Sequence, residues 1–131
     1  MKLLLDTHIW VRSQLNPERL SHRVTRAIND PRNELRISPI STWEIVLLCE
    51  RGRLKLDGGP EAWIQNALTV APLREAPLTH EIASATRSIG LPHRDPGDRL
   101  LVATPLVHGL TLVTADRNLG RSKQVPILLN H

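Results

Sequence analysis

Short apolar runs alternate along the chain with longer segments in which apolar and polar residues recur at helical spacing. The apolar runs predict strands over residues 2–5, 35–38, 75–78, 110–113 and 125–129. The longer segments predict helices over residues 6–15, 21–29, 39–50, 60–70, 79–89 and 95–108, with a short helix after residue 116. Because strands that alternate with helices form crossover units, the pattern predicts an α/β fold with a parallel sheet covered on both faces.

Residues suited to helix ends support these boundaries. Ser21 and Thr79 are favourable N-caps, and Asp95 followed by Pro96 combines an acidic N-cap with proline at the first helical position. Gly109 follows the end of the same helix. Proline cannot donate to a strand ladder, so Pro126 predicts that the last strand lies at a sheet edge or a bulge.

The composition fits one compact domain over residues 1–131. The chain has 40% hydrophobic and 23% charged residues, which is ordinary for a globular protein. No apolar run approaches the roughly 20 residues of a membrane-spanning helix, and residues 3–5 are too short a run for a signal peptide. The lone cysteine, Cys49, excludes an internal disulfide, and we expect a cytoplasmic protein.

The charge balance favours a polyanionic partner without proving one. The formal net charge is +4 and the pI is about 10.2. A basic surface suits nucleic acid, although it serves solubility equally well. There is no Phe or Tyr and there are three Trp residues, which is too few for a base-stacking platform. Any contact with nucleic acid would therefore depend on charge and on the backbone.

Two acidic residues directly follow predicted strands. Asp6 comes after the apolar residues 3–5, and Asp116 follows 110–113 after two intervening residues. Both should lie at the carboxyl edge of the sheet, where α/β proteins bind their ligands. Each of them also suits the N-cap of the helix that follows, so neither residue is decisive alone.

Two further acids lie on apolar helix faces. Glu44 shares a helix face with Ile40, Leu47 and Leu48, where a carboxylate is costly unless it is paired or binds metal. A buried salt bridge to an arginine is the alternative explanation. Asp98 lies in the first turn of its helix, where the positive helix end favours a negative charge.

The four acids together predict a site for a divalent metal ion. Clustered carboxylates repel one another, and a cation removes that repulsion. Oxygen ligands suit Mg²⁺ and Mn²⁺. A bound dication lowers the pKa of water and offsets the charge of a phosphodiester, so the pattern favours metal-dependent hydrolysis of nucleic acid. A phosphatase of the haloacid dehalogenase class is excluded because His8 stands where its second Asp would be.

Four segments of the chain resemble PIN-domain ribonucleases of the VapC toxin type. They are Leu-Leu-Leu-Asp-Thr-His-Ile-Trp (3–10), Ser-Thr-Trp-Glu-Ile (41–45), His-Arg-Asp-Pro-Gly-Asp-Arg-Leu-Leu-Val-Ala (93–103) and Leu-Thr-Leu-Val-Thr-Ala-Asp-Arg (110–117). The resemblance extends over nearly the whole chain in the right order. It implies one PIN domain over 1–131, with a three-layer αβα sandwich and a short, mainly parallel sheet.

The resemblance also implies an activity and partners. It implies a Mg²⁺- or Mn²⁺-dependent endoribonuclease that acts as the toxin of a toxin–antitoxin pair, is held inactive by a VapB-type antitoxin and forms a homodimer. The family's catalytic and metal-binding acids fall on Asp6, Glu44, Asp98 and Asp116, with Thr114 as a supporting hydroxyl. The chain departs from its relatives at Gly97, where they usually carry a bulky residue. The alternative is a PIN-like module that binds RNA or protein without catalysis.

Overall fold

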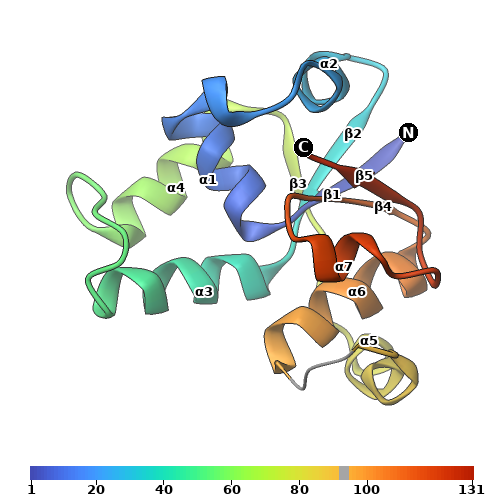
Figure 1. Cartoon of the computed structure of the whole chain (residues 1–131). Helices are drawn as coiled ribbons and strands as arrows, with labels where there is room; N and C mark the ends of the chain where they lie inside the picture. Colours follow the sequence, from blue (N-terminus) through green and yellow to red (C-terminus); the bar gives the residue numbers. More distant parts are fainter. Residues whose placement is uncertain (92–94) are drawn as a thin grey trace.

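A five-stranded, fully parallel sheet forms the centre of the molecule (Figure 1). The computed structural model describes residues 1–91 and 95–131. The strands are β1 (Lys2–Leu5), β2 (Glu34–Ile37), β3 (Leu73–Glu75), β4 (Thr111–Thr114) and β5 (Ile127–Leu129). Their order in the sheet is β3-β2-β1-β4-β5, so β1 is the central strand.

Within residues 1–91 and 95–131, seven α-helices and two 3₁₀ turns connect the strands. They are α1 (Thr7–Leu15), η1 (Pro17–Arg19), α2 (His22–Asn29), α3 (Pro39–Glu50), α4 (Pro60–Val70), α5 (His80–Ala85), η2 (Thr86–Ser88), α6 (Pro96–His108) and α7 (Arg117–Gly120). None of the helices in the described residues has the length and apolarity needed to span a bilayer.

Helices cover both faces of the sheet, which confirms the predicted αβα sandwich. On one face, α1 to α4 pack against Leu3 and Leu5 of β1. On the other face, α5 to α7 pack against Leu4 of β1. The three leucines are at most 1% exposed. An uninterrupted apolar run is what a central parallel strand requires, because both of its faces are buried.

The helix caps predicted at Ser21, Thr79, Asp95 and Gly109 are confirmed. Ser21, Thr79 and Asp95 each accept a hydrogen bond from a backbone N–H of the first helical turn that follows. Gly109 ends α6 with a φ of 68°, a left-handed conformation that glycine adopts without steric penalty.

The strands at the sheet edges differ from the prediction. β3 spans Leu73–Glu75 instead of 75–78, because Pro77 has no N–H with which to continue the ladder against β2. β5 begins only after Pro126 and forms the opposite edge of the sheet, as the proline indicated. The helix expected over 79–89 ends at Ala85 and continues as the 3₁₀ turn η2.

Candidate active site

Asp6 lies buried at the carboxyl end of the central strand. The residue is only 4% exposed. Oδ1 accepts a hydrogen bond from the backbone N–H of Ile9 at 2.8 Å, which caps α1, and Oδ2 accepts one from the Thr114 hydroxyl. Burial raises the pKa of the Asp6 carboxyl, while the hydrogen bonds from Thr114 and Ile9 oppose that shift. The carboxylate is therefore kept away from water with only neutral donors bound to it.

Glu44 projects from α3 towards the start of α1. Its Oε1 accepts a hydrogen bond of 2.6 Å from the Thr7 hydroxyl, which also shares a 2.9 Å hydrogen bond with the Ser41 hydroxyl. Burial raises the pKa of the half-buried Glu44 carboxyl, the Thr7 hydrogen bond lowers it, and the negative charges of Asp95 and Asp6 raise it further. These acids are thus close enough for their charges to interact.

Gly97 allows Glu44 to approach the amino end of α6. A Cβ atom at this buried position would lie 3.3 Å from Glu44 Oε2 and 3.2 Å from Asp95 Oδ1, both closer than ordinary contacts. The amino end of a helix carries partial positive charge, which favours a carboxylate placed against it. The missing side chain at residue 97 therefore leaves room for Glu44 between α1 and α6.

Asp95 and Asp98 lie at the start of α6. Asp95 is its N-cap and accepts hydrogen bonds from the backbone N–H groups of Gly97 (2.8 Å) and Asp98 (3.3 Å), which confirms its structural role. Asp98 is half-buried in the first helical turn, as the sequence predicted. His93 and Arg94, the first residues of the segment 93–103, lie outside the described residues.

Asp116 lies at the end of β4, the neighbour of β1, and is exposed. Its Oδ1 accepts a hydrogen bond from the Asn118 N–H at 2.8 Å, so it caps α7. Its own N–H donates to the Thr114 hydroxyl oxygen at 3.0 Å. Because Thr114 also donates to Asp6, one buried threonine connects the acids at the ends of the two strands.

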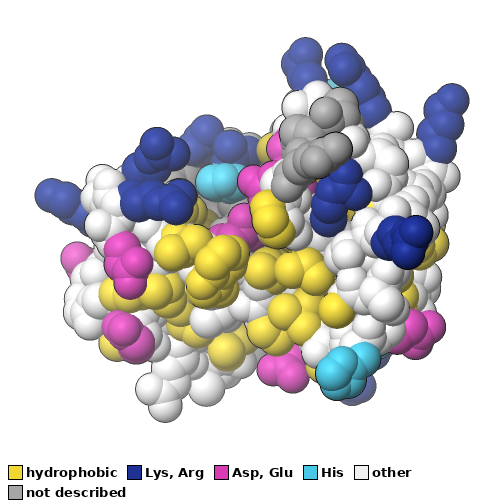
Figure 2. Space-filling model, turned by 90° about the horizontal axis from the view of Figure 1, so that it is seen from below, with side chains coloured by type: hydrophobic (Ala, Val, Ile, Leu, Met, Phe, Trp, Pro, Cys, Tyr) yellow, Lys and Arg dark blue, Asp and Glu magenta, His cyan; other side chains and the backbone are white. Residues whose placement is uncertain are grey.

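No cationic side chain in the described residues forms an ion pair with Asp6 or Glu44. The ion pairs within residues 1–91 and 95–131 join Arg32 to Asp30 and Arg36 to Glu34. The alternative explanation of Glu44, a salt bridge to an arginine, is therefore not realised there. Figure 2 shows acidic side chains at the centre of one face, between groups of Lys and Arg side chains.

Comparison with known proteins identifies the fold family. The PIN domain family matches residues 3–124. The chain belongs to the PIN-domain family. Ribonuclease VapC22 of Mycobacterium tuberculosis is 35% identical to this PIN domain over 127 residues, which are 95% of this chain and 93% of the relative. The suspected relationship to VapC proteins is confirmed.

Solved structures of low sequence identity share the fold of this PIN domain. VapBC2 of Rickettsia felis, solved with a promoter DNA fragment, matches with a TM-score of 0.71 and 17% identity over all of both chains. DNA-bound VapBC of Salmonella typhimurium matches with a TM-score of 0.69 and 20% identity over 98% of this chain and 97% of that chain.

The predicted site residues of this PIN domain converge in part. Asp6 and Glu44 lie within electrostatic reach of each other, and Thr114 links Asp6 to the backbone of Asp116. In the described part of the chain, no group of three or more His, Cys, Asp or Glu side chains is arranged to hold a metal ion. Sequence reasoning missed Thr7 and Ser41; their spacing gave a signal, because Thr7 follows Asp6 and Ser41 precedes Glu44 by one helical turn.

Proposed function

We propose that this chain is a metal-dependent endoribonuclease and the toxin of a VapBC-type pair. Mg²⁺ or Mn²⁺ would be held by Asp6, Glu44, Asp98 and Asp116. The observation that carries the proposal is the Asp6–Glu44 pair, two carboxylates withdrawn from water that form no ion pair with any described residue. Such a pair is unfavourable by itself and becomes favourable when a dication is shared between its oxygens.

The donor set fits a hard metal ion. Carboxylate and hydroxyl oxygens at the carboxyl edge of the sheet match the ligand preference of Mg²⁺ and Mn²⁺. A bound dication of this kind lowers the pKa of water and offsets negative charge on a phosphodiester. The chain's own contribution is to hold the acids still: Thr114 orients Asp6, and Thr7 orients Glu44.

Asp98 and Asp116 would complete the set from the neighbouring elements. Asp98 directly follows Gly97 in α6, and the Glu44 carboxylate lies close to Gly97. The exposed carboxylate of Asp116 follows Thr114 at the end of β4, where it would help to hold the metal ion. The helix-capping role of Asp116 uses its Oδ1 atom.

The partners follow from the relationship to VapC proteins. We expect an RNA substrate, a VapB-type antitoxin that blocks the acidic site, and a homodimer. Hydrophobic side chains gather on the face shown in Figure 2, which supports a protein contact on that face. Trp43 of α3 is 52% exposed and is a further apolar side chain that a protein partner could cover.

The test is cleavage of labelled single-stranded RNA by the purified chain and by Asp6→Asn, in EDTA and in Mg²⁺ or Mn²⁺. The proposal predicts cleavage only with metal and only by the wild-type chain. Metal-independent cleavage, or full activity of Asp6→Asn, would contradict it. The alternative, a non-catalytic PIN-like module that binds RNA or protein, predicts no cleavage under any of these conditions.

A further inference from the structure

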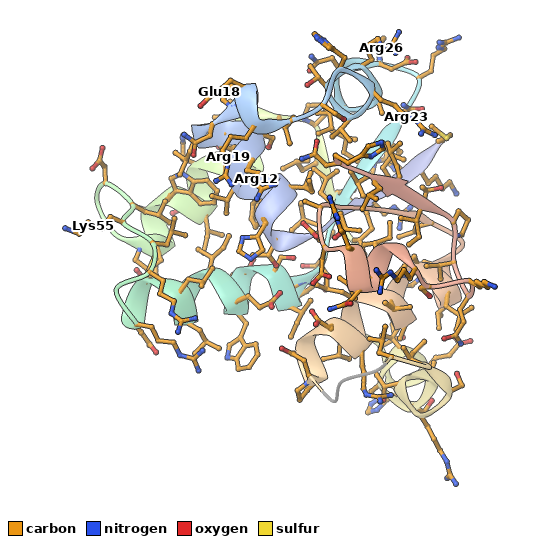
Figure 3. All side chains as sticks on the ribbon, in the orientation of Figure 1. Arg12, Glu18, Arg19, Arg23, Arg26 and Lys55 are labelled. Carbon is orange, nitrogen blue, oxygen red and sulfur yellow. The ribbon has the colours of Figure 1, made fainter. Side chains whose placement is uncertain are left out.

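Residues 12–26 carry an excess of positive charge. They contain Arg12, Arg19, Arg23 and Arg26, which we call the arginine track, and a single acid, Glu18. Figure 3 shows these side chains on α1, η1 and α2. Arg19, Arg23 and Arg26 are exposed and Arg12 is half-buried.

No arginine of the track forms an ion pair within the described residues. The ion pairs found there join Arg32 to Asp30 and Arg36 to Glu34, and neither involves the track. Glu18 accepts a hydrogen bond from the Asn16 side chain at 3.5 Å and pairs with none of the arginines. Arg19, Arg23 and Arg26 are exposed cations without an ion-pair partner among the described residues, which favours an external anion along this stretch.

A buried asparagine fixes the track beside the acidic site. The Asn130 side chain accepts a hydrogen bond from the Ser21 N–H at 2.6 Å and donates one to the Arg19 carbonyl at 3.1 Å. Its backbone N–H donates to the Thr114 carbonyl at 2.7 Å. Since the Thr114 hydroxyl donates to Asp6, Asn130 and Thr114 together link the backbone of Arg19 to the buried acid.

Arg12 connects the track to the same acid from the other side. It lies in the last turn of α1, and its positive charge lowers the pKa of Asp6 as one of the smaller contributions. Its carbonyl accepts a hydrogen bond from the Asn16 N–H, and the carbonyl of Asn16 in turn accepts one from the Arg19 N–H. Arg12 and Arg19 are therefore held on one short, fixed segment next to the site.

We propose that the arginine track binds the phosphates of single-stranded RNA and leads the strand to the acidic site. Arg12 and Arg19 contact the phosphates closest to the scissile bond, and Arg23 and Arg26 extend the path along α2. Arginine suits this role because its planar guanidinium donates two parallel hydrogen bonds to a phosphate. This inference rests on the proposed ribonuclease function and names the surface that the substrate uses.

The test is RNA affinity measured with cleavage switched off. A labelled single-stranded RNA of mixed sequence is titrated with the full chain in EDTA, at several KCl concentrations, and binding is followed by fluorescence anisotropy. The variant is Arg12→Gln with Arg19→Gln. The matched control is Lys2→Gln with Arg74→Gln, which removes two exposed positive charges at the amino end of β1 and on β3, away from Asp6.

Each lost phosphate contact reduces the slope of log K against log salt by about 0.7 for single strands. We therefore expect the double variant of the track to flatten the slope by about 1.4 and to bind RNA roughly twenty-fold more weakly at 0.1 M salt. The control should change affinity less than about two-fold. Unfolding curves of both variants should match that of the wild-type chain.

Equal losses in the track variant and the control would contradict the proposal, as would an unchanged slope in the track variant. In either case, cleavage by the wild-type chain with metal would leave the proposed function intact. If the wild-type chain neither bound nor cleaved RNA, both the arginine track and the ribonuclease function would be rejected.

Discussion

Asp6 and Asp116 occupy equivalent places at the ends of the neighbouring strands β1 and β4, yet they lie in opposite environments. Both cap the helix that follows, so the structural explanation of each residue is correct as far as it goes. Asp6 is buried and has a raised pKa, whereas Asp116 is exposed. Capping does not require burial, since an exposed Asp performs it equally well. The difference indicates that Asp6 does something besides capping.

Glu44 on helix α3 resembles the buried Asp6 more than the exposed Asp116. It belongs with Asp6, because it is half-buried, has a raised pKa and is oriented by a threonine. Each of the two acids with a raised pKa accepts a hydrogen bond from one threonine hydroxyl. Thr114 donates to Asp6, and Thr7 donates to Glu44. If burial matters for function, Asp6 and Glu44 should contribute more to activity than the exposed Asp116 at the end of β4.

Cleavage should depend far more on Asp6 than on Asp116. We expect Asp6→Asn to lower kcat/KM roughly 10³-fold or more, because a carboxylate that holds the metal is lost. Asp116→Asn should lower it roughly 10- to 100-fold, as for a residue that orients the site from outside. Rates with labelled RNA at saturating Mn²⁺ measure both effects. Equal losses would mean that burial does not distinguish the two acids.

Removal of the Thr7 hydroxyl should release Glu44. Thr7→Val keeps the shape of the side chain and deletes the hydrogen bond to Glu44 Oε1, so we expect a roughly ten-fold loss of kcat/KM. Thr7→Ser keeps the hydroxyl and should restore most of the activity. Thr104→Val removes a buried hydroxyl that donates to the Leu100 carbonyl inside α6 and serves as the matched control. A control as inactive as Thr7→Val would show a general packing defect.

In the metal-free chain, replacing Asp6 and replacing Asp116 should change the free energy of unfolding in opposite directions. The folded pKa of Asp6 lies above its ordinary value of 3.8, so its contribution to stability is complete below that pH and is lost as pH rises through the folded pKa. At pH 7 in EDTA, Asp6→Asn should raise the free energy of unfolding by about 1 kcal/mol, because the buried charge is removed while asparagine still caps α1.

Asp116→Ala should instead lower the free energy of unfolding by about 1 kcal/mol, because the cap of α7 is lost. Denaturant unfolding from pH 4 to pH 8 measures both variants. The gain from Asp6→Asn must grow with pH over this range. A gain that stays constant, or turns into a loss at pH 7, would show that Asp6 is not a strained ionised group.

A methyl group at residue 97 should produce the smallest effect. Gly97→Ala places a Cβ 3.3 Å from Glu44 Oε2, so the carboxylate must move by a few tenths of an ångström. We expect an activity loss of roughly three-fold, together with a small gain in stability because alanine favours the helix. Gly90→Ala is the control, since its nearest contact would be Gln124 Oε1 at 3.8 Å. Unchanged activity in Gly97→Ala would show that Glu44 tolerates the shift.

Local chemistry in the sequence predicted most of the fold. Caps at Ser21, Thr79 and Asp95 marked helix starts, because these interactions involve residues two or three positions apart. The order of the strands and the extent of β3 were not predictable in this way. They depend on which strands pair with one another and on where Pro77 interrupts the hydrogen bonds between β2 and β3.

The site was predictable by residue type and only partly by arrangement. Helical spacing identified Glu44 as an acid on an apolar face, and the strand ends identified Asp6 and Asp116. Neither pattern shows that Asp6 is buried while Asp116 is exposed, or that Asn130 joins Thr114 to the Arg19 backbone. The Asp6–Thr114 and Asn130–Arg19 hydrogen bonds behind these features join residues more than a hundred positions apart in the sequence.

Calorimetric titration of Mn²⁺ into the metal-free chain at pH 7 addresses the central point most directly. If Asp6 and Glu44 share a dication, the wild-type chain binds Mn²⁺ saturably and releases protons, and both Asp6→Asn and Glu44→Gln lose that binding while remaining folded. Undiminished Mn²⁺ affinity in these two variants, or no binding by the wild-type chain, would contradict the account.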